Sequence, residues 1–369
     1  METIKGNKRF IEDIIDGMFD WVRVIDKDDN VIYMNKAMSV NAKSVKVGSK
    51  CYHVIGRDTP CENCISRKAV FFGQPHEKEE CIGDKIFSVM SSPVKNEQGK
   101  TVAVVEVLRD ATQMKQLQQE ILRQNIKLQE DLNMARRLQC SMLPKYFPKD
   151  KVDFSFLYNP CEALGGDFLD IFKIDENHLG LYVADVSGHG VPASMLTIFL
   201  RSTLNKRLIS PSEALNDLFF EFNKSDMGED LYITVFYAIL NTEEKTMLYA
   251  NAGHNVSPVI FNTERNTFEI LRQPGVPISR WVEAPEYEDG HAGLNTGDRL
   301  FFSTDGIIEM RNPRKEQFGE DRLFDLLLSS KKDPSGTLNT IIDEACEFAG
   351  IKDLKTIIDD ITIALLEIK

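Results

Sequence analysis

Five aspartates in the C-terminal part of the chain stand at the ends of apolar segments that could form strands. They are Asp167, Asp185, Asp305, Asp359 and Asp360. A carboxylate at the end of a buried strand needs a partner, and no equivalent set of Lys or Arg residues stands at these ends. Antiparallel neighbours place the end of one strand beside the start of the next, so one sheet edge could gather the acids. Divalent cations would balance their charge, and an all-carboxylate site suits Mg²⁺ or Mn²⁺ better than Zn²⁺.

Glycines accompany two of these acids. The pair Gly165-Gly166 precedes the first acid, and Gly188-x-Gly190 follows the second. Glycine lets the backbone turn sharply and approach a ligand closely. The backbone carbonyl of Val186, next to Asp185, could therefore be a further metal ligand.

The elements that must position the acids lie in residues 145–369, where strand-like and helix-like patterns alternate. The expected strands are residues 152–158, 168–174, 179–185, 231–240, 245–250, 256–261, 299–303 and 361–368. The expected helices are residues 192–208, 211–223, 320–329 and 336–349. Ser210-Pro211 is typical of a helix N-cap followed by proline, and Gly350 is typical of the residue just beyond a helix C-terminus.

Five short motifs follow one another within residues 130–369. They are Ala163-Leu-Gly-Gly-Asp-Phe-Leu-Asp170, Ala184-Asp-Val-Ser-Gly-His-Gly190, Asn251-Ala-Gly-His254, Ser303-Thr-Asp-Gly-Ile-Ile-Glu309 and Asp359-Asp-Ile-Thr362. In this order they resemble the motifs of SpoIIE/RsbU-type phosphatases, bacterial members of the metal-dependent PPM serine/threonine phosphatases. The resemblance implies an αββα sandwich, in which two antiparallel sheets pack face to face with helices outside. The segment Gly275-Val-Pro-Ile-Ser-Arg-Trp281 departs from the family's usual run.

The resemblance also implies roles for the acids. Asp185 resembles the carboxylate that bridges two Mn²⁺ or Mg²⁺ ions, with the Val186 carbonyl on one of them. Asp305 and Asp359 resemble ligands of the other ion, and Asp167 resembles the acid that holds metal-bound water. These four acids are the predicted catalytic residues, and Asp360 remains an alternative metal ligand to its neighbour. His254 either packs within its loop or lines the site.

The implied reaction is hydrolysis of a phosphoserine or phosphothreonine on a partner protein, by water that two metal ions activate. By resemblance to the family, the substrate is a phosphorylated anti-sigma-factor antagonist of the STAS type. The alternative is a catalytically silent sensor and scaffold that binds a phosphoprotein. The complete set of acids disfavours this alternative, because a silent scaffold would be free to lose them.

Residues 1–110 are expected to form a small antiparallel sheet with helices between its second and third strands. The expected strands are residues 21–25, 30–34, 85–90 and 101–108, after a helix over residues 7–19. Asp20-Trp-Val-Arg-Val-Ile25, Val31-Ile-Tyr-Met-Asn35 and Arg109-Asp-Ala-Thr112 resemble the opening strands and the exit motif of a PAS sensor domain. The chain is therefore expected to be α+β, with a PAS-like sensor in residues 1–110, a linker helix in 111–144 and a phosphatase domain in 145–369.

Four of the seven cysteines lie close together in the expected sensor. They are Cys51, Cys61, Cys64 and Cys81. Four thiolates could hold Zn²⁺ or an iron–sulfur cluster, and a subset of PAS domains carries a similar run of cysteines. Reduced thiols, or a reversible Cys61–Cys64 pair, are the alternatives.

Residues 110–143 contain neither Gly nor Pro, and they carry a partial heptad pattern. Ile121, Leu128, Ala135 and Met142 recur every seven residues. This pattern favours a dimerising or docking helix over a solvated spacer, so a homodimer is expected. Residues 131–144 resemble the family's regulatory helix, and a sensed signal is expected to shift this helix and so complete or disturb the metal site.

Composition excludes several other classes of protein. The 369 residues carry a net charge of −13, which argues against broad binding to nucleic acid. No apolar run reaches the roughly 18 residues of a membrane span, and the N-terminus lacks a signal-peptide core. An odd number of cysteines does not suggest a secreted disulfide scaffold. We therefore expect a cytoplasmic protein with no membrane or nucleic-acid partner.

Overall fold

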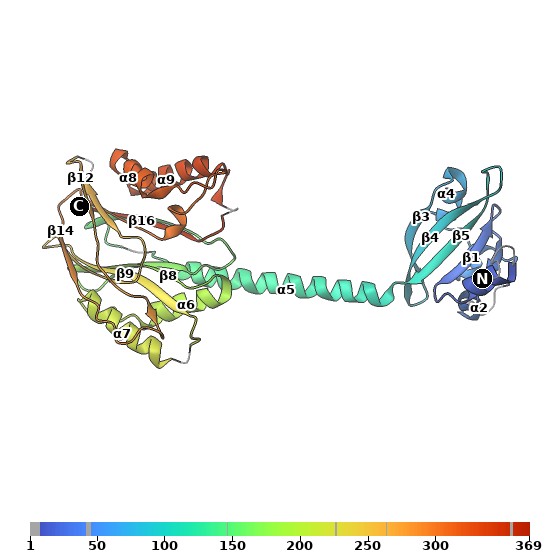
Figure 1. Ribbon diagram of the computed structural model, residues 1–369, viewed down its shortest axis with the longest axis horizontal. Helices are drawn as coiled ribbons and strands as arrows, with labels where there is room; N and C mark the ends of the chain where they lie inside the picture. The colour runs from blue at the N-terminus through green and yellow to red at the C-terminus, as the bar shows by residue number, and fades with distance from the viewer. Residues whose placement is uncertain (1–7, 42–45, 146, 226, 263, 355–356) are drawn as a thin grey trace, which may run out of the picture. The chain divides into compact units, whose positions relative to one another are not determined.

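The computed structural model describes residues 8–41, 46–145, 147–225, 227–262, 264–354 and 357–369 (Figure 1). The chain forms two compact units, residues 1–128 and 129–369. The boundary falls within the helix α5, Thr112–Met142, which corresponds to the long helix that the sequence predicts. Within the ranges that the structure describes, no helix combines the length and the apolar character needed to cross a membrane.

The first unit contains one five-stranded antiparallel sheet with the strand order β2-β1-β5-β4-β3. Its elements are α1 (Lys8–Asp16), β1 (Trp21–Asp26), β2 (Val31–Met34), α2 (Lys36–Asn41), α3 (Cys51–Val54), α4 (Ile65–Phe72), β3 (His76–Ile82), β4 (Lys85–Lys95) and β5 (Thr101–Asp110). As predicted, helices stand between the second strand and the strands that close the sheet. The sequence analysis missed β3, because this strand is rich in charged residues of low strand propensity. Its side chains nevertheless alternate, with Glu77 and Glu79 exposed.

An ion pair lies buried inside this unit. The strand register places Arg23 of β1 opposite Glu106 of β5. The Arg23 Nη2 and Glu106 Oε2 atoms are 2.7 Å apart, and the two side chains are only 5% and 3% exposed. The hydroxyl of Ser91 also donates a hydrogen bond to Glu106. The pair sits beside a core that includes Ile25 and Val104.

The second unit consists of two antiparallel sheets that pack face to face, with helices on their outer sides (Figure 1). The first sheet has the order β14-β10-β9-β8-β7, with β13 paired to β9, and the second has the order β12-β11-β15-β16-β6. Their strands are β6 (Val152–Asn159), β7 (Asp167–Lys173), β8 (His178–Val186), β9 (Tyr232–Asn241), β10 (Thr246–Ala252), β11 (Val259–Asn262), β12 (Thr267–Ile270), β13 (Ile278–Ser279), β14 (Gly290–Gly293), β15 (Arg299–Ser303) and β16 (Ile361–Ile368). The predicted αββα sandwich is confirmed.

The outer layers are formed by two pairs of helices, α6 (Gly190–Thr203) with α7 (Pro211–Lys224), and α8 (Gly319–Ser329) with α9 (Pro334–Ala349). The first pair contacts the first sheet, and the second pair contacts the second sheet. Because each sheet is covered on both faces, β8 and β9 are buried along almost their whole length. Phe236 and Phe302 meet between the sheets, with ring centroids 6.2 Å apart.

Local sequence signals account for several element ends. The Ser210 hydroxyl accepts the Glu213 N–H at the start of α7, as its N-cap position predicts. Gly350 follows α9 with φ of 68°, a left-handed conformation that favours glycine. The helix α6 ends at Thr203, earlier than predicted, because Leu204 adopts an extended conformation. The strands β12, β13 and β14 were missed because they have only two to four residues.

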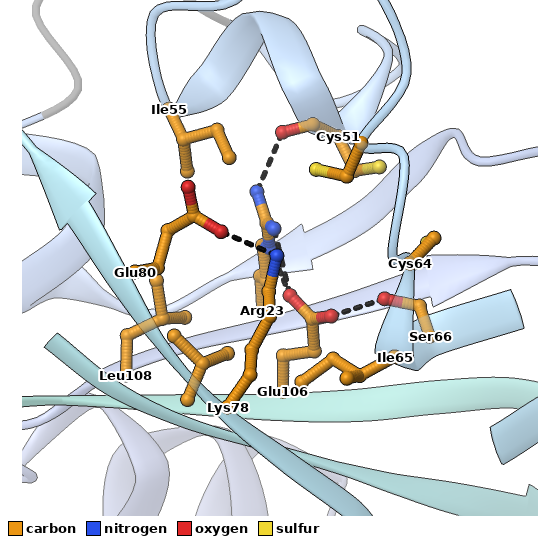
Figure 2. Close-up of a pocket in the computed structure, with 12 residues that line it drawn as sticks. Arg23, Cys51, Ile55, Cys64, Ile65, Ser66, Lys78, Glu80, Glu106 and Leu108 are labelled. Carbon is orange, nitrogen blue, oxygen red and sulfur yellow. Dashed lines mark hydrogen bonds and ion pairs between the residues drawn. The ribbon is translucent and has the colours of Figure 1, made fainter. Parts of the chain in front are cut away.

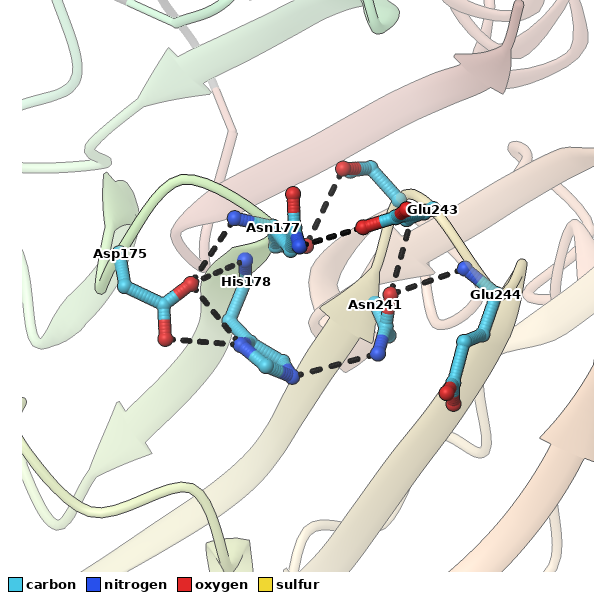
Figure 3. Close-up of polar contacts among 7 residues, drawn as sticks. Asp175, Asn177, His178, Asn241, Glu243 and Glu244 are labelled. Atoms are coloured by element: carbon cyan, nitrogen blue, oxygen red, sulfur yellow. Dashed lines mark hydrogen bonds and ion pairs between the residues drawn. The ribbon is translucent and has the colours of Figure 1, made fainter.

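A polar network holds two turns of the first sheet together (Figure 3). The Asp175 carboxylate accepts hydrogen bonds from the N–H groups of Asn177 and His178, and from the His178 ring at 2.8 Å. The other ring nitrogen of His178 lies 3.3 Å from the Asn241 amide in the next turn. The network is therefore structural, since β8 begins at this turn and reaches Asp185 only at its opposite end.

We expect Glu106→Gln to lower the free energy of unfolding of the first unit by about 3 kcal/mol or more, because the Arg23 charge would stay buried without its partner. Trp21 packs on Phe87 with ring centroids 4.5 Å apart, so its fluorescence reports on this unit. In a Trp281→Phe background Trp21 is the only tryptophan, and urea unfolding can be followed through it.

Glu120→Gln is the matched control for this experiment. Glu120 pairs with Arg123 on the exposed surface of α5, where solvent screens the interaction. The control should leave the urea midpoint of the transition that Trp21 fluorescence reports unchanged. If both substitutions lowered the free energy of unfolding equally, the buried pair would contribute no more than the exposed pair, and the prediction would be contradicted.

Candidate active site

The strand register brings the first two predicted acids together. Asp167, the first residue of β7, lies opposite Asp185 near the end of β8. The Asp167 carboxylate accepts a hydrogen bond of 2.6 Å from the hydroxyl of Thr304, which directly follows β15 of the other sheet. Asp167 therefore points into the space between the two sheets, and Asp185 shares that face because paired residues lie on the same side of a sheet.

The other acids come from the second sheet. Asp305 begins the short helix η1 (Asp305–Ile307) immediately after β15, and Asp359 stands two residues before β16. These two strands are neighbours, so the acids meet at one end of their sheet. Burial raises the pKa of Asp305, and the carboxylates of Asp359 and Glu309 raise it further. The structure thus brings the predicted acids of both sheets into one region.

Electrostatic repulsion links the acids across the two sheets. Burial, together with the neighbouring carboxylates of Asp305, Asp359 and Asp360, raises the pKa of Asp185 to about 7. Asp167 is 2% exposed, and burial followed by repulsion from Asp185 raises its pKa well above the usual range. Each of these groups is costly to ionise until positive charge arrives.

The two adjacent aspartates, which sequence alone leaves as alternatives, have different surroundings. Asp360 is buried, and one of its carboxylate oxygens accepts the Cys161 N–H at 2.8 Å. Its other oxygen accepts the N–H groups of Gly166 at 2.6 Å and Asp167 at 3.3 Å. Asp359 is exposed, and it accepts the N–H of its neighbour. Asp360 therefore holds the turn that carries Asp167, whereas Asp359 faces solvent beside Asp305.

Glycine is favoured where this turn meets the end of β8, because a side chain there would crowd the backbone. A Cβ atom on Gly166 would lie 3.1 Å from the Val186 carbonyl oxygen and 3.0 Å from that of Gly188. The Val186 N–H donates to the Gly166 carbonyl at 3.2 Å. The absence of a side chain at Gly166 thus lets the two backbone segments approach each other, and it places the Val186 carbonyl next to the turn of Asp167.

Two residues that the sequence analysis missed hold the same turn. One is Thr304, whose hydroxyl fixes the Asp167 carboxylate. The other is Gln139 of α5, which is only 2% exposed. Its side-chain amide donates to the Gly165 carbonyl at 2.8 Å and accepts the Gly165 N–H at 3.2 Å. A glutamine on the otherwise apolar face of Leu132 and Ala135 is the signal that could have identified it.

His254 is a packing residue of the strand ends. It is 5% exposed, and its Nε2 atom lies 3.0 Å from the Ser303 carbonyl oxygen. Its Nδ1 atom lies 3.4 Å from the hydroxyl of Thr234, which donates to the Asp185 carbonyl. Burial lowers the pKa of His254 to about 4, so the ring is neutral and donates its Nε2 proton between the two sheets.

The chemistry of the acids fits a hard divalent cation. Their carboxylate oxygens are the donors that Mg²⁺ and Mn²⁺ prefer, and a cation would relieve the repulsion that raises the pKa values of Asp185 and Asp305. As the side chains stand, no group of three or more His, Cys, Asp or Glu in the described ranges could hold a metal ion. Binding would therefore require these carboxylates to turn toward a common point.

The cysteines of the first unit do not form the four-thiolate site that was expected. Cys51, Cys61 and Cys64 line one pocket together with Arg23 and Glu106 (Figure 2). Burial raises the pKa of Cys51 to about 12, so in the absence of a metal ion it is a neutral thiol at neutral pH.

The fourth cysteine, Cys81, is exposed and lies apart from this pocket. It follows Glu80 on β3, and Glu80 is buried and lines the pocket. Successive side chains of a strand point to opposite faces of the sheet, so Cys81 faces away. As the described side chains stand, the four cysteines do not form a metal-holding group, and the possibility of a Zn²⁺ or iron–sulfur site in this unit has no support in the structure.

Comparisons with known proteins agree with the family that the motifs resemble. The family model of stage II sporulation protein E (SpoIIE) matches residues 175–369. Phosphoserine phosphatase RsbP of Bacillus subtilis (strain 168) is 25% identical over 214 residues, which are 56% of this chain and 51% of that protein. Phosphoserine phosphatase RsbU of the same organism is 25% identical over 188 residues, 50% of this chain and 55% of that protein. The chain thus spans about half the length of these relatives.

A solved structure supports the architecture independently. The SiaA-PP2C domain of Pseudomonas aeruginosa superposes with a TM-score of 0.57 at 18% identity. The match covers 66% of this chain and 98% of that domain. At this level of identity the likeness establishes the fold of the second unit.

Proposed function

Because the chain belongs to the SpoIIE family, we propose that it is a metal-dependent protein phosphatase that hydrolyses phosphoserine or phosphothreonine on a partner protein. The observation that carries this proposal is the meeting of buried and half-buried, mutually repelling aspartates where the ends of the two sheets adjoin. The two relatives named as phosphoserine phosphatases support the same reaction class.

The acids divide into ligands and positioning residues. Asp185, Asp305, Asp359 and the Val186 carbonyl would hold two Mn²⁺ or Mg²⁺ ions. Such ions, when bound, supply the Lewis acidity and positive charge that attack on a phosphate ester needs. We assign Asp360 to positioning, because both of its carboxylate oxygens already accept backbone N–H groups.

In this proposal, Asp167 is the general base. Its carboxylate is fixed by Thr304 and lies opposite Asp185, so it can orient the attacking water and accept a proton from it. The side chain is only 2% exposed and is held by the hydrogen bond from Thr304, so its position relative to the water is fixed.

The scaffold alternative fits these observations less well. A phosphate group and several carboxylates repel one another, so the cluster would weaken phosphoprotein binding unless cations were present. A protein that only bound its partner would gain nothing from burying these acids. The inferred partner is a phosphorylated regulatory protein, and the resemblance of the motifs extends this inference to an anti-sigma-factor antagonist of the STAS type.

We also propose that α5 regulates the site. Its last turns belong to the second unit, where the Gln139 side chain forms two hydrogen bonds with the backbone of Gly165, two residues before Asp167. A displacement of α5 by about one hydrogen-bond length would break these hydrogen bonds and change the position of Asp167. The PAS-like first unit would provide the signal, since its last strand leads directly into this helix.

The exposed side of α5 supports a homodimer. Leu117, Ile121, Leu128 and Leu138 follow the heptad seam, and each is between 54% and 58% exposed. A seam of large apolar side chains in water is unfavourable, and a second copy of the helix would cover it.

We expect Asp185→Asn and Asp305→Asn to lower Mn²⁺-dependent hydrolysis of p-nitrophenyl phosphate by more than about 100-fold, because each removes a charged ligand. A chelator should abolish the activity of the unmodified chain, and circular dichroism should show that both variants stay folded. Asp343→Asn, on the exposed surface of α9, is the control and should keep full activity. Full activity in both ligand variants would remove the two-metal assignment.

Gln139→Ala is expected to raise the Mn²⁺ concentration needed for half-maximal activity by roughly tenfold, because the turn of Asp167 loses its support. Gln118→Ala removes a glutamine from an exposed position of the same helix and should leave the metal titration unchanged. Identical titrations for the two variants would show that the contact between Gln139 and Gly165 has no part in metal binding.

The homodimer predicts a specific response in analytical ultracentrifugation. The double variant Ile121→Glu/Leu128→Glu should sediment as a monomer, because two charges would face each other within the seam. Leu122→Glu is matched in exposure, at 60%, but lies off the seam and should remain dimeric. A monomeric unmodified chain, or a dimer that survives the double substitution, would refute this interface.

A further inference from the structure

A cavity of about 220 Å³ opens directly beside the acid cluster. Its lining includes Asp359 and Gly306, so it shares residues with the proposed catalytic edge. Most of the remaining wall is apolar and consists of Met310, Ala349, Ile351, Ile357, Ile358 and Ile361. Drug-sized ligands occupy pockets of roughly 300–1,000 Å³, so this cavity suits a single bulky side chain better.

Three segments of the second sheet and its outer layer build this cavity. Met310 follows η1, Ala349 and Ile351 flank the end of α9, and Ile361 begins β16. Met310, Ala349 and Ile361 are themselves buried and belong to the core between the sheet and its helices. The floor is therefore part of a packed core, and its shape does not depend on surface side chains.

The mouth of the cavity has an unusual composition. Ile358, the residue immediately before Asp359, is 97% exposed, although large apolar residues are normally covered. Glu309 and Arg311 are exposed at the same mouth, and Arg311 is the one cation among the lining residues. An exposed isoleucine next to a proposed metal ligand is well placed to contact a substrate whose phosphate binds at the metal site.

We propose that this cavity receives an apolar side chain of the phosphoprotein substrate, one or two residues from the phosphorylated Ser or Thr. The inference rests on the proposed function, because the phosphate must lie at Asp305 and Asp359. Consecutive Cα atoms are 3.8 Å apart, so a cavity that shares Asp359 with the reacting site is reached within two residues. The carboxylates of Glu309 and Asp359 at the mouth would disfavour an acidic residue in this position.

Two synthetic phosphoserine peptides test this assignment. In one peptide, leucine occupies the first and second positions on each side of the phosphoserine. In the other peptide, alanine occupies the same positions. With Mn²⁺ and the full chain, the leucine peptide should have a kcat/KM about tenfold higher, chiefly through a lower KM, because burying the larger side chain strengthens binding. Hydrolysis of p-nitrophenyl phosphate, which has no flanking residues, is measured in parallel.

Variants of the cavity decide which surface causes the preference. Ile358→Ala and Ile351→Ala should bring the ratio of the two kcat/KM values close to one. Because Ile358 is 97% exposed, its truncation removes no core packing. Phe220→Ala removes a 65% exposed aromatic from α7 and should keep the preference for leucine.

The outcomes separate this inference from the proposed function. Equal kcat/KM values for the two peptides in the unmodified chain, or a preference that survives Ile358→Ala and Ile351→Ala, would overturn the cavity assignment while the phosphatase remains established. Absence of hydrolysis of both peptides and of p-nitrophenyl phosphate would overturn the proposed function, and the cavity assignment with it.

Discussion

Repulsion among carboxylates buried where the two sheets adjoin is the constraint on which the second unit depends. Burial and neighbouring negative charge raise the pKa values of Asp167, Asp185 and Asp305 together. The surrounding structure must therefore hold these groups in place against their mutual repulsion. Uncharged donors do part of this work, since the Thr304 hydroxyl fixes Asp167 and backbone N–H groups surround Asp360. Such donors position a carboxylate but leave its charge available to a cation.

The turn of Gly165, Gly166 and Asp167 connects the site to distant parts of the chain. Asp360 holds this turn from the second sheet, and Gln139 holds it from α5. A change in either contact alters the position of Asp167 without touching the strands that form the core. The buried strands are thus a rigid frame, and the turn is the element through which the regulation proposed for α5 would act.

The sequence predicted those parts of the fold in which local pattern and tertiary packing agree. The strands Arg299–Ser303 and Ile361–Ile368 were predicted with the correct bounds, because each is an apolar run with both faces covered. The charged strand β3 was missed, since its place in the sheet comes from pairing with β4. The sequence also could not predict how the surroundings of Asp359 and Asp360 differ. Adjacent residues of one type carry the same local signal, and only the fold shows which of them accepts backbone hydrogen bonds.

Other buried acids in the same chain show why the cluster is chemically distinct. Burial acts to raise the pKa of Asp298, but hydrogen bonds from Asn262 and Asn295 and the charge of Arg265 outweigh it, so the pKa of Asp298 is lowered. Glu106 is likewise buried against Arg23 in the first unit. In both places a protein cation balances the carboxylate, and the group is structural. The named neighbours of Asp185 are further acids, and they raise its pKa in the same direction as burial does. A carboxylate of this kind gains most from an external cation, and this difference, more than the number of acids, is the reason for placing the proposed reaction at the end of the two sheets.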